Sequence, residues 1–234
     1  MYSTWCRTRC NTVGRGTGGT CINVVRRYCG ERVGFTVRQT CDGAGQTCCG
    51  ALHRHNGRPE EADRRLNRNA KAFTGLTTIG LASACAAELR VHPELTTTQD
   101  LCRFLADHDW PARVRLAPLP QRVAVHVPCS QRNRLRDEEA AFALLRRIPA
   151  ITLVPLADNP FCCGAAGTYL LQRPILSRAL LAPKIGDLAA LQAPILVTTN
   201  TGCALHLAAG AREAGLRIEV LHPVELIARQ LRLP

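Results

Sequence analysis

Two copies of a Cys-Cys-Gly-Ala sequence stand in this chain, at 48–51 and at 162–165. In each half an isolated cysteine precedes the pair by 33 to 38 residues, and another follows it by 36 to 40 residues. The same order at similar spacings indicates an internal duplication in which each half assembles one group of thiolates. The cysteines of this pattern are Cys10, Cys48, Cys49 and Cys85 in the first half, and Cys129, Cys162, Cys163 and Cys203 in the second.

The adjacent cysteines suggest what such a group would bind. Neighbouring side chains of an extended strand point to opposite faces, so a vicinal pair chelates one tetrahedral ion only if the backbone turns. Gly50 and Gly164 permit that turn, because glycine tolerates positive φ and lets main-chain N–H groups approach bound sulfur. A cluster of several irons relaxes the constraint, since neighbouring thiolates can bind different irons. We therefore predict iron–sulfur clusters, with a vicinal disulfide, unliganded thiols and structural zinc as the alternatives.

Length and composition set the outer limits. With 234 residues, 46% of them hydrophobic, the chain can bury one sizeable core or two small ones, and the repeat favours two lobes. The thirteen cysteines are odd in number and no apolar leader opens the sequence, so we expect a cytoplasmic protein. The longest apolar run, at 76–89, is too short and too polar for a membrane span, although peripheral contact with a membrane-bound acceptor stays open.

The charge does not indicate a nucleic-acid partner. The formal net charge is +12, yet Lys71 and Lys184 are the only lysines, so the positive charge is almost all arginine and is spread along the chain. Aromatic residues make up 4% of the sequence, and no nucleic-acid motif accompanies the arginines. We interpret the arginines as a compositional bias that could also help to dock an acidic redox partner.

The periodicity of the second half predicts alternating strands and helices, and hence an α/β lobe with a mostly parallel sheet. Its cysteines fall where strands end or helices begin, which is where open α/β sheets bind ligands. The expected strands are 122–127, 151–154, 194–199 and 216–221, and the expected helices are 137–147, 174–191 with an interruption at Pro183, 203–214 and 223–231.

The first half repeats this pattern less clearly. We expect a strand at 33–37, a charged helix at 59–73 and a strand at 76–81, followed by a linker at 110–120 that is rich in proline. The predicted fold is two tandem lobes, residues 1–115 and 120–234, each a small mostly parallel sheet flanked by helices. Spacing alone selects Cys10 as the upstream ligand, in competition with Cys6, Cys21, Cys29 and Cys41.

Three segments resemble a known family. Residues 162–169, 199–208 and 46–57 are similar to the cysteine-rich CCG domains found in the glycolate oxidase iron-sulfur subunit, in heterodisulfide reductase and in lactate-utilisation proteins. The resemblance is strong over 121–231 and moderate over 46–89. It implies an iron-sulfur subunit, without catalytic residues of its own, that accepts electrons from a flavoprotein oxidising a 2-hydroxy acid such as glycolate or lactate.

The resemblance also implies the cofactors and partners. One or two clusters, of the [4Fe-4S] type, would be bound by the eight cysteines of the pattern, whereas flavin and NAD would belong to the flavoprotein. The chain lacks the C-x2-C-x2-C-x3-C-P runs of the family's ferredoxin-like module, so a separate ferredoxin-like subunit is a further expected partner. By analogy with heterodisulfide reductase, thiol or disulfide reduction is an alternative function, and a zinc-stabilised interaction module is another.

Cys203 is followed three residues later by a histidine, where the heterodisulfide reductase form has a second cysteine. If Cys203 opens a helix capped by Asn200 or Thr201, His206 shares its face and would bind iron or hydrogen-bond a cluster sulfur. In the first half the corresponding position is Glu88. Besides the cysteines, we name four cofactor contacts: Gly50, Gly164, Gly202 and His206.

Overall fold

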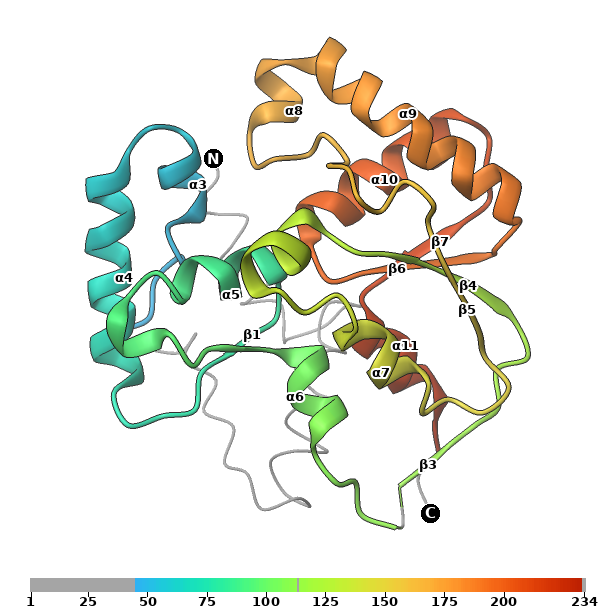
Figure 1. Ribbon diagram of the computed structural model, residues 1–234, viewed down its shortest axis with the longest axis horizontal. Helices are drawn as coiled ribbons and strands as arrows, with labels where there is room; N and C mark the ends of the chain where they lie inside the picture. The colour runs from blue at the N-terminus through green and yellow to red at the C-terminus, as the bar shows by residue number, and fades with distance from the viewer. Residues whose placement is uncertain (1–44, 113, 233–234) are drawn as a thin grey trace.

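The computed structural model describes residues 45–112 and 114–232, and its centre is a four-stranded parallel sheet (Figure 1). The prediction of an α/β protein with a parallel sheet flanked by helices is therefore confirmed. The strands, in their spatial order, are β5 (Thr152–Pro155), β4 (Arg122–His126), β6 (Ile195–Thr198) and β7 (Glu219–Leu221).

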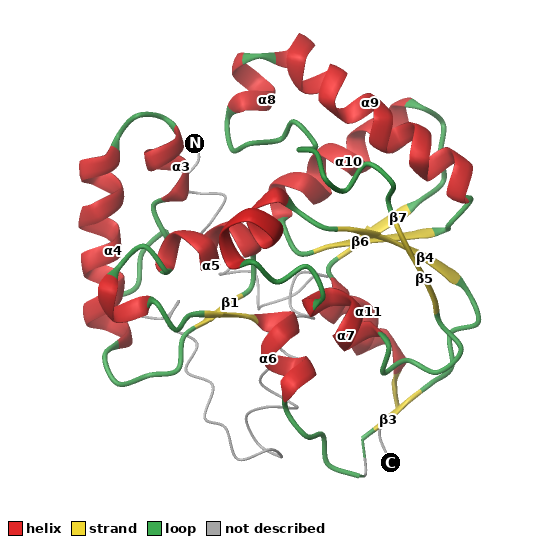
Figure 2. Ribbon diagram, viewed as in Figure 1, coloured by secondary structure: helices red, strands yellow, loops and turns green. Residues whose placement is uncertain are grey.

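Helices cover both faces of this sheet (Figure 2). Along β4, Val123 and Val125 point into one core and Ala124 into the other, as the alternation of a strand requires. The first core packs against α6 (Leu101–Asp107), α7 (Ala140–Leu145) and α11 (Pro223–Gln230). The second packs against α9 (Pro174–Leu191) and α10 (Thr201–Glu213). Because both faces are covered, the strands read as nearly continuous apolar runs.

The chain changes direction across the sheet between β4 and β6. It runs from β4 outward to β5, then returns past β4 to β6 and continues to β7, and all the pairings are parallel. The connection from β4 to β5 carries the π-helical turn η4 (Ser130–Leu135) and α7, whereas that from β5 to β6 carries α8 (Tyr169–Gln172) and α9. The reversal makes the carboxyl ends of β4 and β6 a topological switch point, where such sheets bind ligands.

The described part of the first half, from residue 45 onward, has fewer strands. Its described elements are α3 (Ala51–His55), α4 (Pro59–Phe73), β1 (Ile79–Gly80), α5 (Ser83–Leu89), the 3₁₀ turn η3 (Pro93–Leu95), β2 (Gln99–Asp100) and α6. The strands β1 and β2 pair in parallel. This run of β1, α5, β2 and α6 repeats the order of β6, α10, β7 and α11, in agreement with an internal duplication.

The two halves share a core. Leu101, Phe104 and Leu105 of α6 lie in the same buried cluster as β4, α7 and α11. Within the expected linker, β3 (Arg115–Leu116) pairs antiparallel with β8 (Leu231–Arg232). The division at 115 and 120 stays a prediction.

Most expected elements occur with small changes at their ends. The helix expected at 59–73 has those bounds, with Pro59 at its first position. Two expectations need correction: the strand expected at 76–81 is only Ile79–Gly80, the length paired with β2, and α9 runs through Pro183 without a break. Burial of Leu181, Lys184 and Leu188 holds α9 across the proline. The strand expected at 33–37 lies outside the described residues. None of the described helices is long and apolar enough to cross a bilayer.

Candidate metal centre

The four second-half cysteines meet at the carboxyl ends of three neighbouring strands. Cys129 lies in the turn after β4, Cys162 and Cys163 in the loop after β5, and Cys203 in the first turn of α10, after β6. Hydrogen bonds between thiols join Cys162 to Cys129 and to Cys163, and Cys163 to Cys203. The sequence pattern and the switch point of the sheet thus coincide.

The thiols share protons in a chain. Hydrogen bonds from Cys129 and then Cys163 lower the pKa of Cys162, because both neighbours donate to its thiolate. The hydrogen bond to Cys162 in turn raises the pKa of Cys129 and of Cys163, and burial raises both further. Metal binding would displace the remaining protons, since thiolates are the ligands.

The loop after β5 brings backbone close to sulfur. Gly164 has φ 84°, and its N–H donates to Cys162 Sγ over 3.3 Å. A Cβ at this position would lie 2.5 Å from the carbonyl oxygen of Ser177, which is at the fourth position of α9. The turn and the close helix both therefore require glycine.

The first turn of α10 carries Cys203 into the same site. The Asn200 side chain caps this helix by accepting from Gly202 N at 3.0 Å and from Cys203 N at 3.3 Å. A helix N-terminus stabilises the negative charge of a group bound beside it. Gly202 lies in this turn and is half-buried, with the cap oxygen 3.3 Å from where its Cβ would be.

His206 lies behind the cysteine loop. Its Nε2 is 3.0 Å from Ser177 Oγ, which itself donates to the carbonyl oxygen of Gly164. In this arrangement His206 supports the turn at Gly164 from the α9 side, and its contact with a cluster stays a prediction.

A histidine that the sequence did not single out lies among the cysteines. His126, the last residue of β4, is 1% exposed, and one ring nitrogen lies within 4.8 Å of the Cys163 and Cys203 sulfurs. Its Nδ1 is 2.9 Å from Thr198 Oγ1, and its buried Nε2 has no hydrogen-bond partner among the described residues. Burial, and then the charge of Lys184, lowers the pKa of His126 to about 3.

Lys184 supplies a buried positive charge near this site. Its Nζ donates to the carbonyl oxygen of Asp158 over 2.8 Å and lies 3.1 Å from Asp158 Oδ2. Its charge also contributes to the lowered pKa of Cys162. A fixed cation beside a group of thiolates offsets their mutual repulsion.

Three first-half cysteines form a second group. Cys49 hydrogen-bonds to Cys48 and to Cys85, and these bonds, in that order, raise the pKa of Cys49. The bond to Cys49 lowers the pKa of Cys85. Gly50 has φ 96°, and its Cβ would lie 3.0 Å from the Cα of Ala62, at the fourth position of α4. The loop therefore repeats the packing of Gly164 on α9.

The position three residues after Cys85 is filled by an ion pair. Glu88 is buried, and Oε1 accepts from Arg54 Nε over 2.7 Å, while Arg54 also binds Asp63. His53 and His55 lie on the same short helix as Arg54. The remaining candidates for the first site, Cys6, Cys10, Cys21, Cys29 and Cys41, lie outside the described residues.

Hydrogen bonds join the two sites. Ser83 N, at the start of α5, donates to the carbonyl oxygen of Thr199 over 3.0 Å, and Ser83 Oγ is 2.8 Å from Ser130 Oγ. On the side of the paired cysteines, Thr168 Oγ1 donates to Asn56 Oδ1 over 2.6 Å. The helices that carry Cys85 and Cys203 therefore begin at a common junction.

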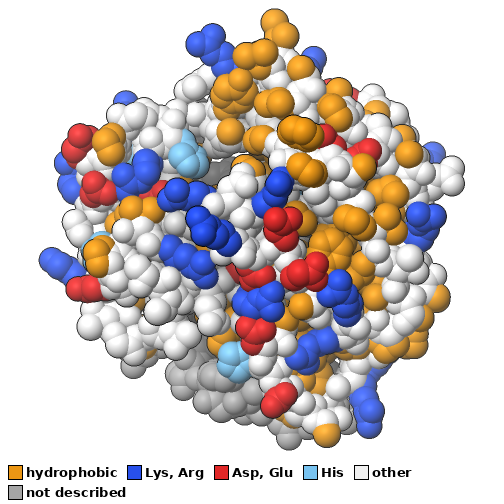
Figure 3. All heavy atoms as spheres, viewed as in Figure 1, with side chains coloured by type: hydrophobic (Ala, Val, Ile, Leu, Met, Phe, Trp, Pro, Cys, Tyr) orange, Lys and Arg blue, Asp and Glu red, His pale blue; other side chains and the backbone are white. Residues whose placement is uncertain are grey.

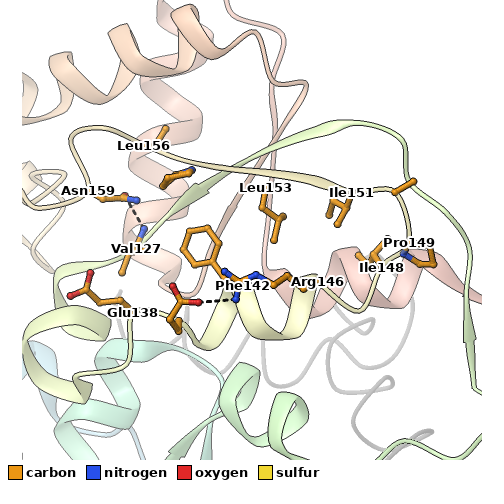
Figure 4. A pocket seen from close by; sticks show the side chains of 13 residues that line it. Val127, Glu138, Phe142, Arg146, Ile148, Pro149, Ile151, Leu153, Leu156 and Asn159 are labelled. Atoms are coloured by element: carbon orange, nitrogen blue, oxygen red, sulfur yellow. Dashed lines mark hydrogen bonds and ion pairs between the residues drawn. The ribbon is translucent and has the colours of Figure 1, made fainter.

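A groove lies elsewhere, between α7 and the edge strand β5 (Figure 4). It has a volume of about 770 Å³ and is lined by Phe142, Arg146, Leu153 and their neighbours. No cysteine lines it. The thiol chemistry is therefore separate from this groove.

Exposed apolar side chains gather over α8 and α9, at the top of Figure 3. Two further exposed residues flank the second-half cysteines: Phe161, which precedes Cys162, and Leu205, two residues after Cys203. Apolar surface of this kind is typical of a protein interface. We define the apolar surface as Phe161, Leu171, Ile175, Leu176, Leu180 and Leu205.

Comparison with known proteins identifies relatives of this arrangement. Lactate utilization protein A of Shouchella clausii is 26% identical over 235 residues, covering 91% of this chain and 92% of its own length. Lactate utilization protein A of Oceanobacillus iheyensis is 27% identical over 221 residues, covering 84% of this chain and 86% of its own length. The glycolate oxidase iron-sulfur subunit of Escherichia coli is 28% identical over 220 residues, covering 86% of this chain and 52% of its own length.

A family model described as the cysteine-rich domain, CCG, matches residues 31–88 and 123–208. The two matches contain both cysteine pairs and the single cysteines at 85, 129 and 203. The chain therefore belongs to the CCG cysteine-rich domain family.

Proposed function

We propose that this chain is an iron–sulfur protein that carries electrons in the oxidation of a 2-hydroxy acid. The observation that supports it most is the convergence of Cys129, Cys162, Cys163 and Cys203 at one edge of the sheet. A bound cluster would supply reversible one-electron transfer. The chain would hold it through thiolates, with the Gly164 N–H, the N-terminus of α10 and Lys184 stabilising its negative charge.

The contacts of the adjacent cysteines favour a cluster over a single ion. Besides their contact with each other, Cys162 contacts Cys129 and Cys163 contacts Cys203, so each neighbour has one partner that the other lacks. A cluster accommodates this, because each side of it offers a different iron. We propose a [4Fe-4S] type, with a second cluster at Cys48, Cys49 and Cys85 completed by Cys10.

The electron donor we propose is a flavoprotein that oxidises a 2-hydroxy acid. The relatives are named for lactate utilization and for glycolate oxidase, which makes lactate and glycolate the acids to test. Cys129 is exposed at the rim of the second site, and the apolar surface begins next to Cys162, so the flavoprotein would dock there. A ferredoxin-like subunit is the proposed acceptor, and we propose a cytoplasmic location for the assembly.

The first experiment measures metal and sulfide in the full chain after anaerobic purification. Brown protein with iron and acid-labile sulfide supports the proposal. Colourless protein with stoichiometric zinc and no sulfide overturns it in favour of an interaction module.

The second experiment follows the visible absorbance of the clusters. Lactate or glycolate should bleach it only in the presence of the cognate flavoprotein, because the acid would be oxidised on the flavin. If both acids fail and a disulfide rapidly oxidises the reduced protein, the function is disulfide reduction.

A further inference from the structure

The buried ring of His126 is left with one nitrogen unused. Nδ1 lies 2.9 Å from the hydroxyl of Thr198, its cross-strand partner in the sheet. Nε2 is fully buried and has no hydrogen-bond partner in the described part of the chain. Leaving a buried nitrogen without a hydrogen-bond partner is unfavourable. A group that occupies this position in the loaded protein would remove that cost.

The surroundings of this ring indicate what the group is. Residues 45–112 and 114–232 contain one group of three or more His, Cys, Asp or Glu side chains with all ligand atoms within 4.8 Å of one another: His126, Cys163 and Cys203. Two ligands at about 2.3 Å from one tetrahedral ion lie about 3.8 Å apart. Small movements of side chains would therefore bring all three donors onto a common metal centre.

Thr198 lies where it can orient the imidazole ring of His126. It is 2% exposed, and its pairing with His126 fixes the two side chains on the same face of the sheet. A histidine that binds metal through one nitrogen usually donates the other N–H to an oxygen. The contact with Thr198 Oγ1 meets that requirement, since Nδ1–H can donate to it and leave the Nε2 lone pair for the metal.

We infer that His126 Nε2 is a ligand to the iron–sulfur cluster of the second site, on the side formed by Cys163 and Cys203. The inference rests on the proposed function, because it requires a cluster there. As a ligand beside the thiolates, a neutral nitrogen adds no negative charge to the site, and histidine ligands favour the reduced state in other iron–sulfur proteins. Thr198 is the positioning residue for this ligand.

The test is pulsed electron paramagnetic resonance on the reduced full chain, prepared with ¹⁵N-histidine and, for comparison, with unlabelled histidine. The wild-type cluster should show the strong nitrogen coupling of a directly bound ring, and the label should change it. The coupling should disappear in His126→Asn, which keeps a polar group toward Thr198, and should persist in the control His92→Asn, whose histidine hydrogen-bonds Asn67 and Glu94 in the first half. Thr198→Val should alter the coupling without removing iron.

A second variant tests the inference even if His126→Asn fails to bind the cluster. His126→Cys offers a thiolate instead, so it should retain iron and sulfide, lose the nitrogen coupling and shift the reduction potential to a more negative value.

The outcomes separate the two proposals. Iron and sulfide without a strong histidine coupling in the wild-type protein, or a coupling that survives in His126→Asn, overturns this inference alone. A wild-type chain without iron and sulfide overturns both.

Discussion

The two cysteine sites share one loop design but differ in their supports. In both, a glycine with positive φ follows the cysteine pair and presses on the fourth residue of a helix that begins with proline. The second site lies on a four-stranded sheet, whereas the first lies beside the two-stranded pair of β1 and β2. The helix that carries Cys203 has 13 residues and a side-chain cap, but the one that carries Cys85 has seven residues and Ala82 at its cap position. The same cysteine loop is therefore held by two different frameworks.

The largest expected difference concerns iron content. Cys163→Ser should remove most of the iron, because Cys163 is buried between Cys162 and Cys203 on the more extensive framework. Cys49→Ser should remove less. The measurement is iron and acid-labile sulfide per chain after anaerobic reconstitution. Equal losses, or a larger loss from Cys49→Ser, would contradict the ranking of the sites.

The paired glycines test the loop design itself. Gly164→Ala should destabilise the protein by about 2–4 kcal/mol, from the positive φ and from a Cβ pressed against backbone. Gly50→Ala should destabilise the protein by about 1 kcal/mol less than Gly164→Ala does. The reason is that the new Cβ would lie 3.0 Å from its nearest atoms at position 50, but 2.5 Å at position 164. Denaturant unfolding of both variants measures the difference. Gly57→Ala is the control for positive φ alone, since nothing lies within 4 Å of its Cβ position.

The caps of α6 and α11 should respond oppositely to pH. Burial raises the pKa of the α6 cap, Asp100, to about 6, so its folded form holds a proton more tightly than the unfolded chain does. The contribution of Asp100 to the free energy of unfolding is therefore fully present below its unfolded pKa near 3.8. It is lost as the pH rises through 6, and the loss amounts to up to about 3 kcal/mol. Burial lowers the pKa of His222, the cap of α11, to about 4. The contribution of His222 to the free energy of unfolding is therefore present above its unfolded pKa of 6.5 and is lost as the pH falls through 4.

Stability measured from pH 3.5 to 7 in wild type, Asp100→Asn and His222→Asn separates the two contributions. As the pH rises, the free energy of unfolding of the wild type should fall relative to that of Asp100→Asn. Over the same range it should rise relative to that of His222→Asn. A flat profile in either case would mean that the corresponding side chain is not buried as it is here.

The smallest expected effects concern the caps of the two cysteine-bearing helices. Asn200→Ala should cost about 1 kcal/mol, because two N–H groups lose their acceptor. Ala82→Ser should add a few tenths to 1 kcal/mol at the corresponding position of α5, whose backbone is already extended. Thermal unfolding with the clusters removed checks both. A destabilising Ala82→Ser would show that the α5 N-terminus has no room for a cap.

The sequence predicted the elements whose signals are local. Pro59 and the charged periodicity gave α4 its bounds, and the apolar run before Pro128 gave β4. His126 could not be found in this way, because its environment depends on pairing with Thr198, 72 residues away. The available signal was a histidine at the end of an otherwise apolar strand, three residues before Cys129. Similarly, α9 continues through Pro183 because its tertiary packing outweighs the hydrogen bond that proline lacks.

The placement of α6 has a consequence for synthesis of the chain. Leu101, Phe104 and Leu105 complete a core whose last member, Ile227, is made 120 residues after α6 ends at Asp107. At about 5–20 residues per second, the ribosome needs about 6–24 s to supply the missing surface. During that interval the apolar face of α6 gains its native partners one element at a time, first β4 and α7 and last α11. Nascent chains are therefore expected to need chaperone protection until the second half, with its four cysteines, has been made.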